Sequence, residues 1–300
     1  MKKFLLFVLA ATGFATSSFA AKPEPELIKP SGPWNAHYAE ESCLLARSFG
    51  TGDDEIQIVI SRFNPGDRFT FEINGKKIKS GKADSKVTIQ FGPSEKEQNV
   101  SIIYGNRGRD LPAVFFQGRL RIAGGTDEEL KLLENRKKGE FVEFAPIGEE
   151  REVKVQFVAM SGITKRPIIL ATGSLGKAFA ELRKCTDNLV TSWGIDVDKH
   201  KKLQRPLRPK MSSDQWFIAS DYPINMLAVG GRSLIHFRVI VDTNGMPTSC
   251  NIQQSNRLPE FDILVCKSLM KRAKFTPAID ENGLPILSYW TQSVFFTLPS

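Results

Sequence analysis

The stretch LIHFRVIVDTNGMPTSCNIQ, residues 234 to 253, decides the fold of the C-terminal part of the chain. Its first eight residues place apolar side chains at every second position, a period typical of a strand with one buried face. Asp242 to Gly245 is a turn sequence, and residues 248 to 253 return as a second strand. The stretch therefore predicts a β-hairpin.

Two more elements follow the hairpin. A helix is expected to begin at Pro259, where the missing amide of proline costs nothing, and to end near Arg272. Gly283 turns the chain, and residues 286 to 298 form a long closing strand. Residues 220 to 300 thus predict a small domain with the order strand, strand, helix, strand.

The closing strand lacks charged residues and proline, which usually prevent the edge of a sheet from pairing with other chains. We expect it to lie at the edge of its sheet and to accept a strand from a protein partner, or from a second copy of this chain in a homodimer. Alternation directs one set of side chains toward the helix: Trp290, Val294, Phe296 and Leu298. The expected partner-binding side chains lie on the other face: Tyr289, Thr291, Ser293 and Phe295.

Residues 34 to 195 have a different pattern, with short runs of β-branched and aromatic residues between turn sequences, which favours an antiparallel sheet or sandwich. Asn74-Gly75 predicts a hairpin with residues 76 to 78, and residues 153 to 158 predict a further strand. Ser174 caps one strong helix that Gly194 ends. The sequence therefore predicts an α+β protein: a mostly-β N-terminal domain with one terminal helix, then a small two-layer ββαβ domain.

Residues 1 to 20 have the pattern of a secretory signal peptide, with cleavage expected between Ala20 and Ala21. Residues 21 to 33 contain four prolines and predict an extended arm. We therefore expect a periplasmic protein that does not span the membrane after cleavage. An even number of cysteines, four, favours disulfides in an exported chain.

Of the net charge of +8, +5 lies between Lys199 and Trp216, within residues 196 to 219, which we expect to form a basic linker. This segment is either a solvated spacer or a contact with an anionic surface such as lipopolysaccharide or peptidoglycan. Its basic residues are Lys199, Lys201, Lys202, Arg205, Arg208 and Lys210.

No pattern indicates catalysis, a cofactor, a metal or nucleic acid. The cysteines lack C-x-x-C spacing and the three histidines are scattered, which argues against zinc. Residues 171 to 178 resemble a phosphate-binding loop, but Ala171 and Ala178 replace its essential glycine and hydroxyl residue. His236, on the polar face of its strand, is expected to be solvated.

The C-terminal domain resembles that of the TonB family of periplasmic energy transducers. The resemblance rests on Asp221-Tyr222-Pro223, Ala228, Val241-Asp242 with Gly245, Ser255-Asn256, Phe261-Asp262 and Phe275-x-Pro277-Ala278. It implies a bond between Cys250 and Cys266, as in a cysteine-containing branch of the family. Pairing within each domain also predicts a bond between Cys43 and Cys185.

Transducers of this family have a membrane anchor and a long proline-rich spacer, whereas the segment from Lys22 to Pro33 reaches at most about 37 Å. We therefore expect an exported, non-catalytic adaptor that engages an extended partner segment. The alternatives are an envelope-binding protein that uses the basic linker, an energy transducer for outer-membrane transport, and an enzyme housed in the N-terminal domain.

Overall fold

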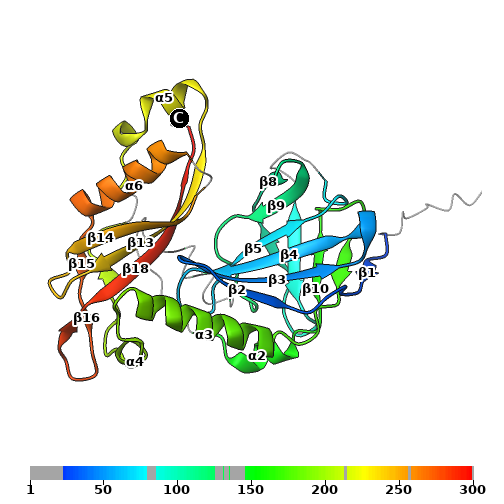
Figure 1. Cartoon of the computed structure of the whole chain (residues 1–300), viewed down its shortest axis with the longest axis horizontal. Helices are drawn as coiled ribbons and strands as arrows, with labels where there is room; N and C mark the ends of the chain where they lie inside the picture. The colour runs from blue at the N-terminus through cyan, green and yellow to red at the C-terminus, as the bar shows by residue number, and fades with distance from the viewer. Residues whose placement is uncertain are drawn as a thin grey trace, which may run out of the picture.

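The computed structural model describes residues 23–79, 86–125, 131, 135, 146–212, 215–255 and 258–298. The protein is mixed α/β, and most of its described elements are strands in several sheets. The mostly-β composition expected from the sequence is confirmed. Two units lie side by side, the first built from the N-terminal part of the chain and the second from the C-terminal part (Figure 1).

The first unit contains β1 (Glu26–Ile28), β2 (Asn35–Tyr38), β3 (Cys43–Phe49), β4 (Ile56–Arg62), β5 (Thr70–Asn74), β6 (Val87–Phe91), β7 (Gln98–Val100), β8 (Ile102–Arg107), β9 (Leu111–Phe116), α2 (Glu149–Lys154), β10 (Val158–Ser161), β11 (Ile168–Leu170) and α3 (Gly176–Ser192). One sheet has the order β1-β11-β10-β6-β7, and the other has the order β2-β3-β4-β5-β9-β8. Both contribute to one core, where the ring of Phe69 lies 5.6 Å from that of Phe91 and 5.5 Å from that of Phe179 of α3.

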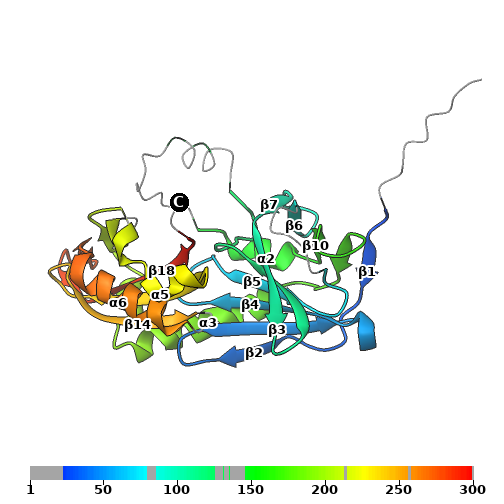
Figure 2. The same cartoon turned by 90° about the horizontal axis from the view of Figure 1, so that it is seen from above.

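Helix α3 packs against β3 and β2, and its C-terminal end reaches the second unit in both views (Figures 1 and 2). The backbone N–H of Gly176 donates to Ser174 Oγ at 3.3 Å, although the capping position itself is Leu175. Gly194, with φ of 76°, follows the last turn as the sequence predicted. The disulfide between Cys43 and Cys185 joins β3 to α3, which confirms that pairing.

The second unit contains α4 (Val197–His200), β12 (Arg208–Pro209), a 3-10 turn η3 (Ala219–Asp221), α5 (Ile224–Ala228), β13 (Ser233–Val241), β14 (Pro247–Gln254), α6 (Pro259–Arg272), β15 (Phe275–Thr276), β16 (Ala278–Ile279), β17 (Pro285–Ile286) and β18 (Ser288–Phe296). Its main sheet has the order β14-β13-β18, and α6 packs on one face of it. Along the chain, β13 and β14 precede α6, and the short strands β15 to β17 separate α6 from β18. A disulfide between Cys250 and Cys266 joins β14 to α6, as predicted.

Two segments expected to be extended connectors are parts of the folded units. Within the arm of residues 21 to 33, β1 pairs parallel with β11 and Ile28 is buried in the first core. Within the basic linker of residues 196 to 219, β12 pairs with β15, and Leu207 and Trp216 are buried in the second core. Proline content and charge predicted exposure, but the apolar residues between them anchor both segments.

Two local predictions in the first unit are wrong. The strand expected at residues 153 to 158 does not form, since residues 149 to 154 form helix α2 and the next strand, β10, begins at Val158. The buried residue of α2 is Glu152, which pairs with Arg183 at 2.6 Å, whereas Val153 is 55 % exposed. Asn74-Gly75 ends β5, which pairs with β4 and β9 instead of forming a hairpin with residues 76 to 78. Gly75 is required at this point because a Cβ would lie 2.5 Å from the carbonyl oxygen of Glu55.

Candidate functional site

Strand β18 lies at the edge of the main sheet of the second unit, as the sequence predicted. All nine of its residues pair antiparallel with β13, from Phe296 opposite Ser233 to Ser288 opposite Val241. The other side of β18 has no strand neighbour within the described residues. That side therefore presents backbone positions at which a further strand could add.

One face of β18 packs on the second core. Trp290, Val294 and Phe296 contact this core, as alternation predicted. The ring of Phe296 stacks on that of Phe261 in α6, with centroids 5.1 Å apart. Leu298 was expected on this face, but it is 42 % exposed and follows the end of the strand.

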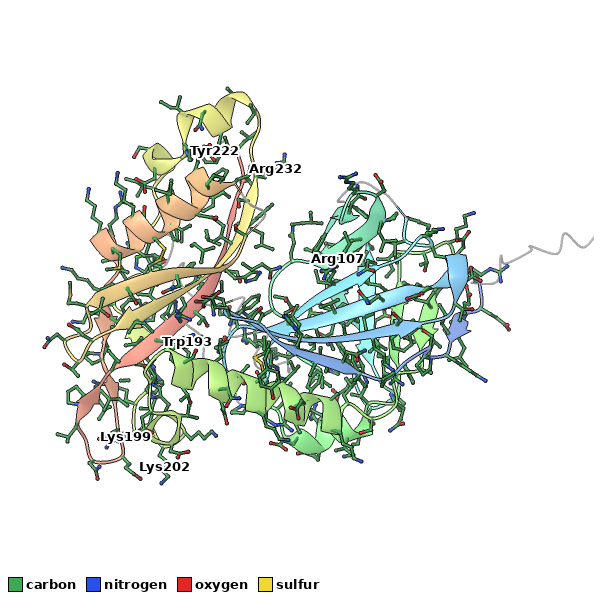
Figure 3. The ribbon with its side chains drawn as sticks, in the orientation of Figure 1. Arg107, Trp193, Lys199, Lys202, Tyr222 and Arg232 are labelled. Carbon is green, nitrogen blue, oxygen red and sulfur yellow. A yellow bond between two sulfur atoms is a disulfide. The ribbon has the colours of Figure 1, made fainter. Side chains whose placement is uncertain are left out.

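The opposite face of β18 lies against the first unit, which corrects the expectation that its side chains face a partner. Tyr289 contacts Trp193 at the end of α3, with ring centroids 5.0 Å apart, and stacks on His200 at 5.8 Å. Burial raises the pKa of the Tyr289 phenol above its ordinary range. Trp193 lies where α3 meets β18 (Figure 3).

The next two side chains on this face are also used within the chain. Thr291 donates a hydrogen bond to Oδ1 of Asn64 at 2.9 Å. The hydroxyl of Ser293 lies 2.5 Å from Nδ1 of His236. Phe295, which is 40 % exposed, is the member of the expected set that these contacts leave accessible. The partner-binding feature of β18 is thus its unpaired edge rather than this face.

The polar face of β13 is also buried, although the sequence predicted that it would be solvated. His236 and Arg238 are 3 % and 6 % exposed, because the first unit covers this face of the sheet. Beside them, Ile240 forms a small apolar cluster with Val190 and Ile195. The main sheet is therefore held between α6 on one face and the first unit on the other.

His236 is enclosed by groups from both units. Its ring stacks on Phe63 with centroids 4.4 Å apart and an angle of 14° between the planes. Burial, assisted by the nearby charge of Arg119, lowers the pKa of His236 to about 3. At neutral pH the ring is consequently uncharged.

Arg238 forms an ion pair across the contact between the units. Its Nη1 donates to Oε2 of Glu41 at 2.6 Å, and its guanidinium lies 4.2 Å from the centroid of the Trp193 ring. From β14, the side-chain amide of Gln253 donates to the carbonyl oxygens of Glu41 and Phe63 at 3.1 and 3.0 Å. These bonds fix the position of the second unit with directional contacts as well as apolar ones.

Arg119 approaches β18 from the first unit. Its Nη1 donates to Oδ1 of Asn64 at 2.8 Å and to Oγ1 of Thr291 at 3.4 Å. Its Nη2 is buried without a hydrogen-bond partner. Burial, with Arg68 nearby, lowers the pKa of the guanidinium to about 10.

The basic segment does not form a surface of unopposed charge. Three of its lysines lie near carboxylates: Lys199 at 3.9 Å from Asp196, Lys201 at 2.6 Å from Asp187, and Lys202 at 4.0 Å from Glu281. Arg205 donates to the carbonyl oxygen of Pro277 at 3.2 Å. Arg208 and Lys210 lie in and beside the short strand that pairs with β15. Lys199 and Lys202 are labelled in Figure 3.

The described residues can be compared with the geometries of metal sites and of catalytic triads. They contain no group of three His, Cys, Asp or Glu side chains arranged to hold a metal. The pair of Ser293 and His236 resembles part of a catalytic triad, but the groups described around His236 are Phe63, Ser293 and Arg119, without a carboxylate. No described helix is both long enough and apolar enough to cross a membrane. Comparison with protein-family models and with curated proteins gives no match for this chain.

The sequence identified β18 but missed the first-unit residues that meet its sheet. Glu41, Phe63, Asn64 and Arg119 lie in or beside turns far from β18 in the chain. No local period marks such residues, because they contact the second unit only after both units have folded. The available signal was the strong polar and apolar alternation of β13 itself.

Proposed function

We propose that this chain is an exported, non-catalytic adaptor whose second unit binds an extended segment of another protein by adding it as a strand to β18. The observation that carries the proposal is a nine-residue strand that pairs on one side and has neither charge nor proline. Such an edge is the template used in strand addition, where backbone hydrogen bonds supply affinity and side-chain pockets supply specificity.

The surroundings of β18 support this role. The strand is held by β13, by α6 through Phe296, and by the first unit through Thr291. A rigid edge loses little conformational freedom when a partner binds, so more of the interaction energy contributes to affinity. The resemblance of residues 220 to 300 to the TonB C-terminal family leads to the same proposal.

Export to the periplasm belongs to the same proposal. Each unit contains one disulfide that joins two of its elements, and such bonds persist in oxidising compartments. The expected signal peptide and its cleavage point at Ala20 and Ala21 lie outside the described residues. An anionic-surface role for the basic segment has less support, because half of its basic side chains lie near carboxylates.

The test uses the mature chain with both disulfides formed, and measures the capture of extended peptides together with the molar mass in solution. Phe295→Lys places a charge on the edge strand at a side chain that is already 40 % exposed, so the fold should survive. Val153→Lys, at a 55 % exposed residue of α2, is the matched control.

We expect the unaltered chain and V153K to capture peptides, and F295K to lose this capture. If the unaltered chain instead forms a dimer that F295K dissociates, the edge is occupied by a second copy. A chain that stays monomeric and captures no peptide contradicts the proposal.

A further inference from the structure

Arg119 is half-buried with its Nη2 atom fully buried, and it differs from the buried arginines of the described chain. Arg62, Arg121 and Arg238 each lie within 4 Å of a carboxylate, at distances of 3.8, 2.8 and 2.6 Å. Arg119 forms no ion pair among the described residues, and its hydrogen bonds go to neutral oxygens of Asn64 and Thr291. The ring of Phe63 also lies near the guanidinium, with its centroid 5.9 Å from the guanidinium carbon. A cation that has a buried, unpaired donor and no counter-charge is costly, so its presence calls for a function.

The free hydrogen-bonding capacity of Arg119 lies beside β18. Its Nη1 reaches Thr291 on this strand, while Nη2 has no partner. Asn64 and Thr291 also bond to each other at 2.9 Å. They would therefore keep a partner if the guanidinium turned toward an incoming group.

Strand geometry defines which part of an added segment meets Arg119. Directly opposed residues of neighbouring strands point to the same face, with Cβ atoms about 5 Å apart. A residue opposite Thr291 would therefore project toward the face on which Arg119 lies. Phe295 is on the same face four residues further along, about 13 Å away at the usual rise per residue.

We infer that the segment received by β18 is acidic, with an Asp or Glu bound by Arg119 and an apolar residue four positions away that contacts Phe295. A carboxylate is the group that best matches a guanidinium with an unused donor, since it supplies both the missing charge and a hydrogen-bond acceptor. Arg68 adds positive potential at the same place. This inference rests on the proposed function and specifies the chemistry of the partner.

The experiment selects peptides from a random displayed library on the mature, disulfide-bonded chain. Three proteins are compared: the unaltered chain, Arg119→Met, and Lys177→Met as the control for the loss of a positive charge. Lys177 is exposed on α3 and forms no ion pair within the described part of the chain. Methionine keeps the length of the side chain, and thermal melting verifies that each protein is folded.

We expect the unaltered chain and K177M to enrich peptides with Asp or Glu four positions from an apolar residue, and R119M to capture peptides without this acidic preference. Replacing the selected Glu by Gln in one such peptide should weaken binding to the unaltered chain about tenfold or more, and binding to R119M by less than about twofold. The peptide substitution tests the inference even if R119M folds poorly.

Two distinguishable outcomes would overturn the inference that Arg119 binds an acidic residue of the partner. Capture without an acidic preference, or an equal effect of the Glu to Gln change on both proteins, removes the role of Arg119 and leaves strand addition intact. Failure of the folded, unaltered chain to capture any peptide removes strand addition, and this inference with it.

Discussion

Acidification should weaken the contact between the two units through His236. The pKa of this ring is lowered from about 6.5 to about 3 in the folded chain. A base whose pKa is depressed in the folded chain binds its proton more readily in the unfolded or separated state. Its contribution is therefore complete above pH 6.5 and is lost as the pH falls from 6.5 toward 3.

The size of the effect follows from the difference between the two pKa values. Each pKa unit corresponds to about 1.4 kcal/mol, so the full difference is about 5 kcal/mol, and about 2.5 kcal/mol is lost between pH 7 and pH 4.5. The side chain is 3 % exposed, so solvent screening reduces this little. Phe63 and Ser293 give no opposing negative charge, and Arg119 acts in the same direction as burial.

The assay is urea unfolding at a series of pH values for the unaltered chain, His236→Asn and His37→Asn. Asparagine at position 236 can still bond to Ser293 but does not titrate, and His37 is exposed on β2. H236N should lose about 2.5 kcal/mol less stability than the other two proteins between pH 7 and pH 4.5. Equal losses in all three proteins would refute the reasoning, because the shared carboxylates would then explain the whole pH dependence.

Three further results are expected. Replacing Cys43 by Ala opens a loop of 142 residues and should cost about 5 kcal/mol of unfolding free energy. Cys250→Ala opens a loop of 16 residues and should cost about 3 kcal/mol, so equal costs in denaturant titrations would contradict this prediction. Arg238→Ala should destabilise the chain by about 3 kcal/mol, because it leaves the carboxylate of Glu41 without its partner, and a second change of Glu41→Gln should restore part of the loss. The intact mass of the exported protein should correspond to a chain that starts at Ala21, whereas a product that retains residue 1 would disprove cleavage.

Much of the second unit could be predicted because its patterns are local. The alternation of β13, the proline at the start of α6 and the absence of charge in β18 each depend on a few neighbouring residues. The structure places these elements within a few residues of the expected positions. The edge position of β18 followed from the same kind of reasoning.

The contact between the units could not be predicted in this way. Alternation shows that β13 has a polar face, but it does not show whether water or another unit covers that face. Arg238 and Glu41 are 197 residues apart in the chain, and nothing near either residue identifies the other. In the first unit, helix α2 could not be predicted for the same reason, since distant arginines compensate the buried charge of its Glu152.

The buried polar contact and the unpaired edge belong to the same strand, which couples them. Thr291 holds β18 against the first unit through Asn64, and Ser293 bonds to His236 of β13, whose ring stacks on Phe63 of the first unit. The backbone edge of the strand remains the place for a partner. A segment that pairs with this edge and also binds Arg119 would contact both units at once. It would therefore bind the docked arrangement more tightly than the separated one, and by linkage it would stabilise that arrangement by the same free energy. Protonation of His236 acts on the same equilibrium in the opposite direction, so acid should release the partner from a chain that is still folded.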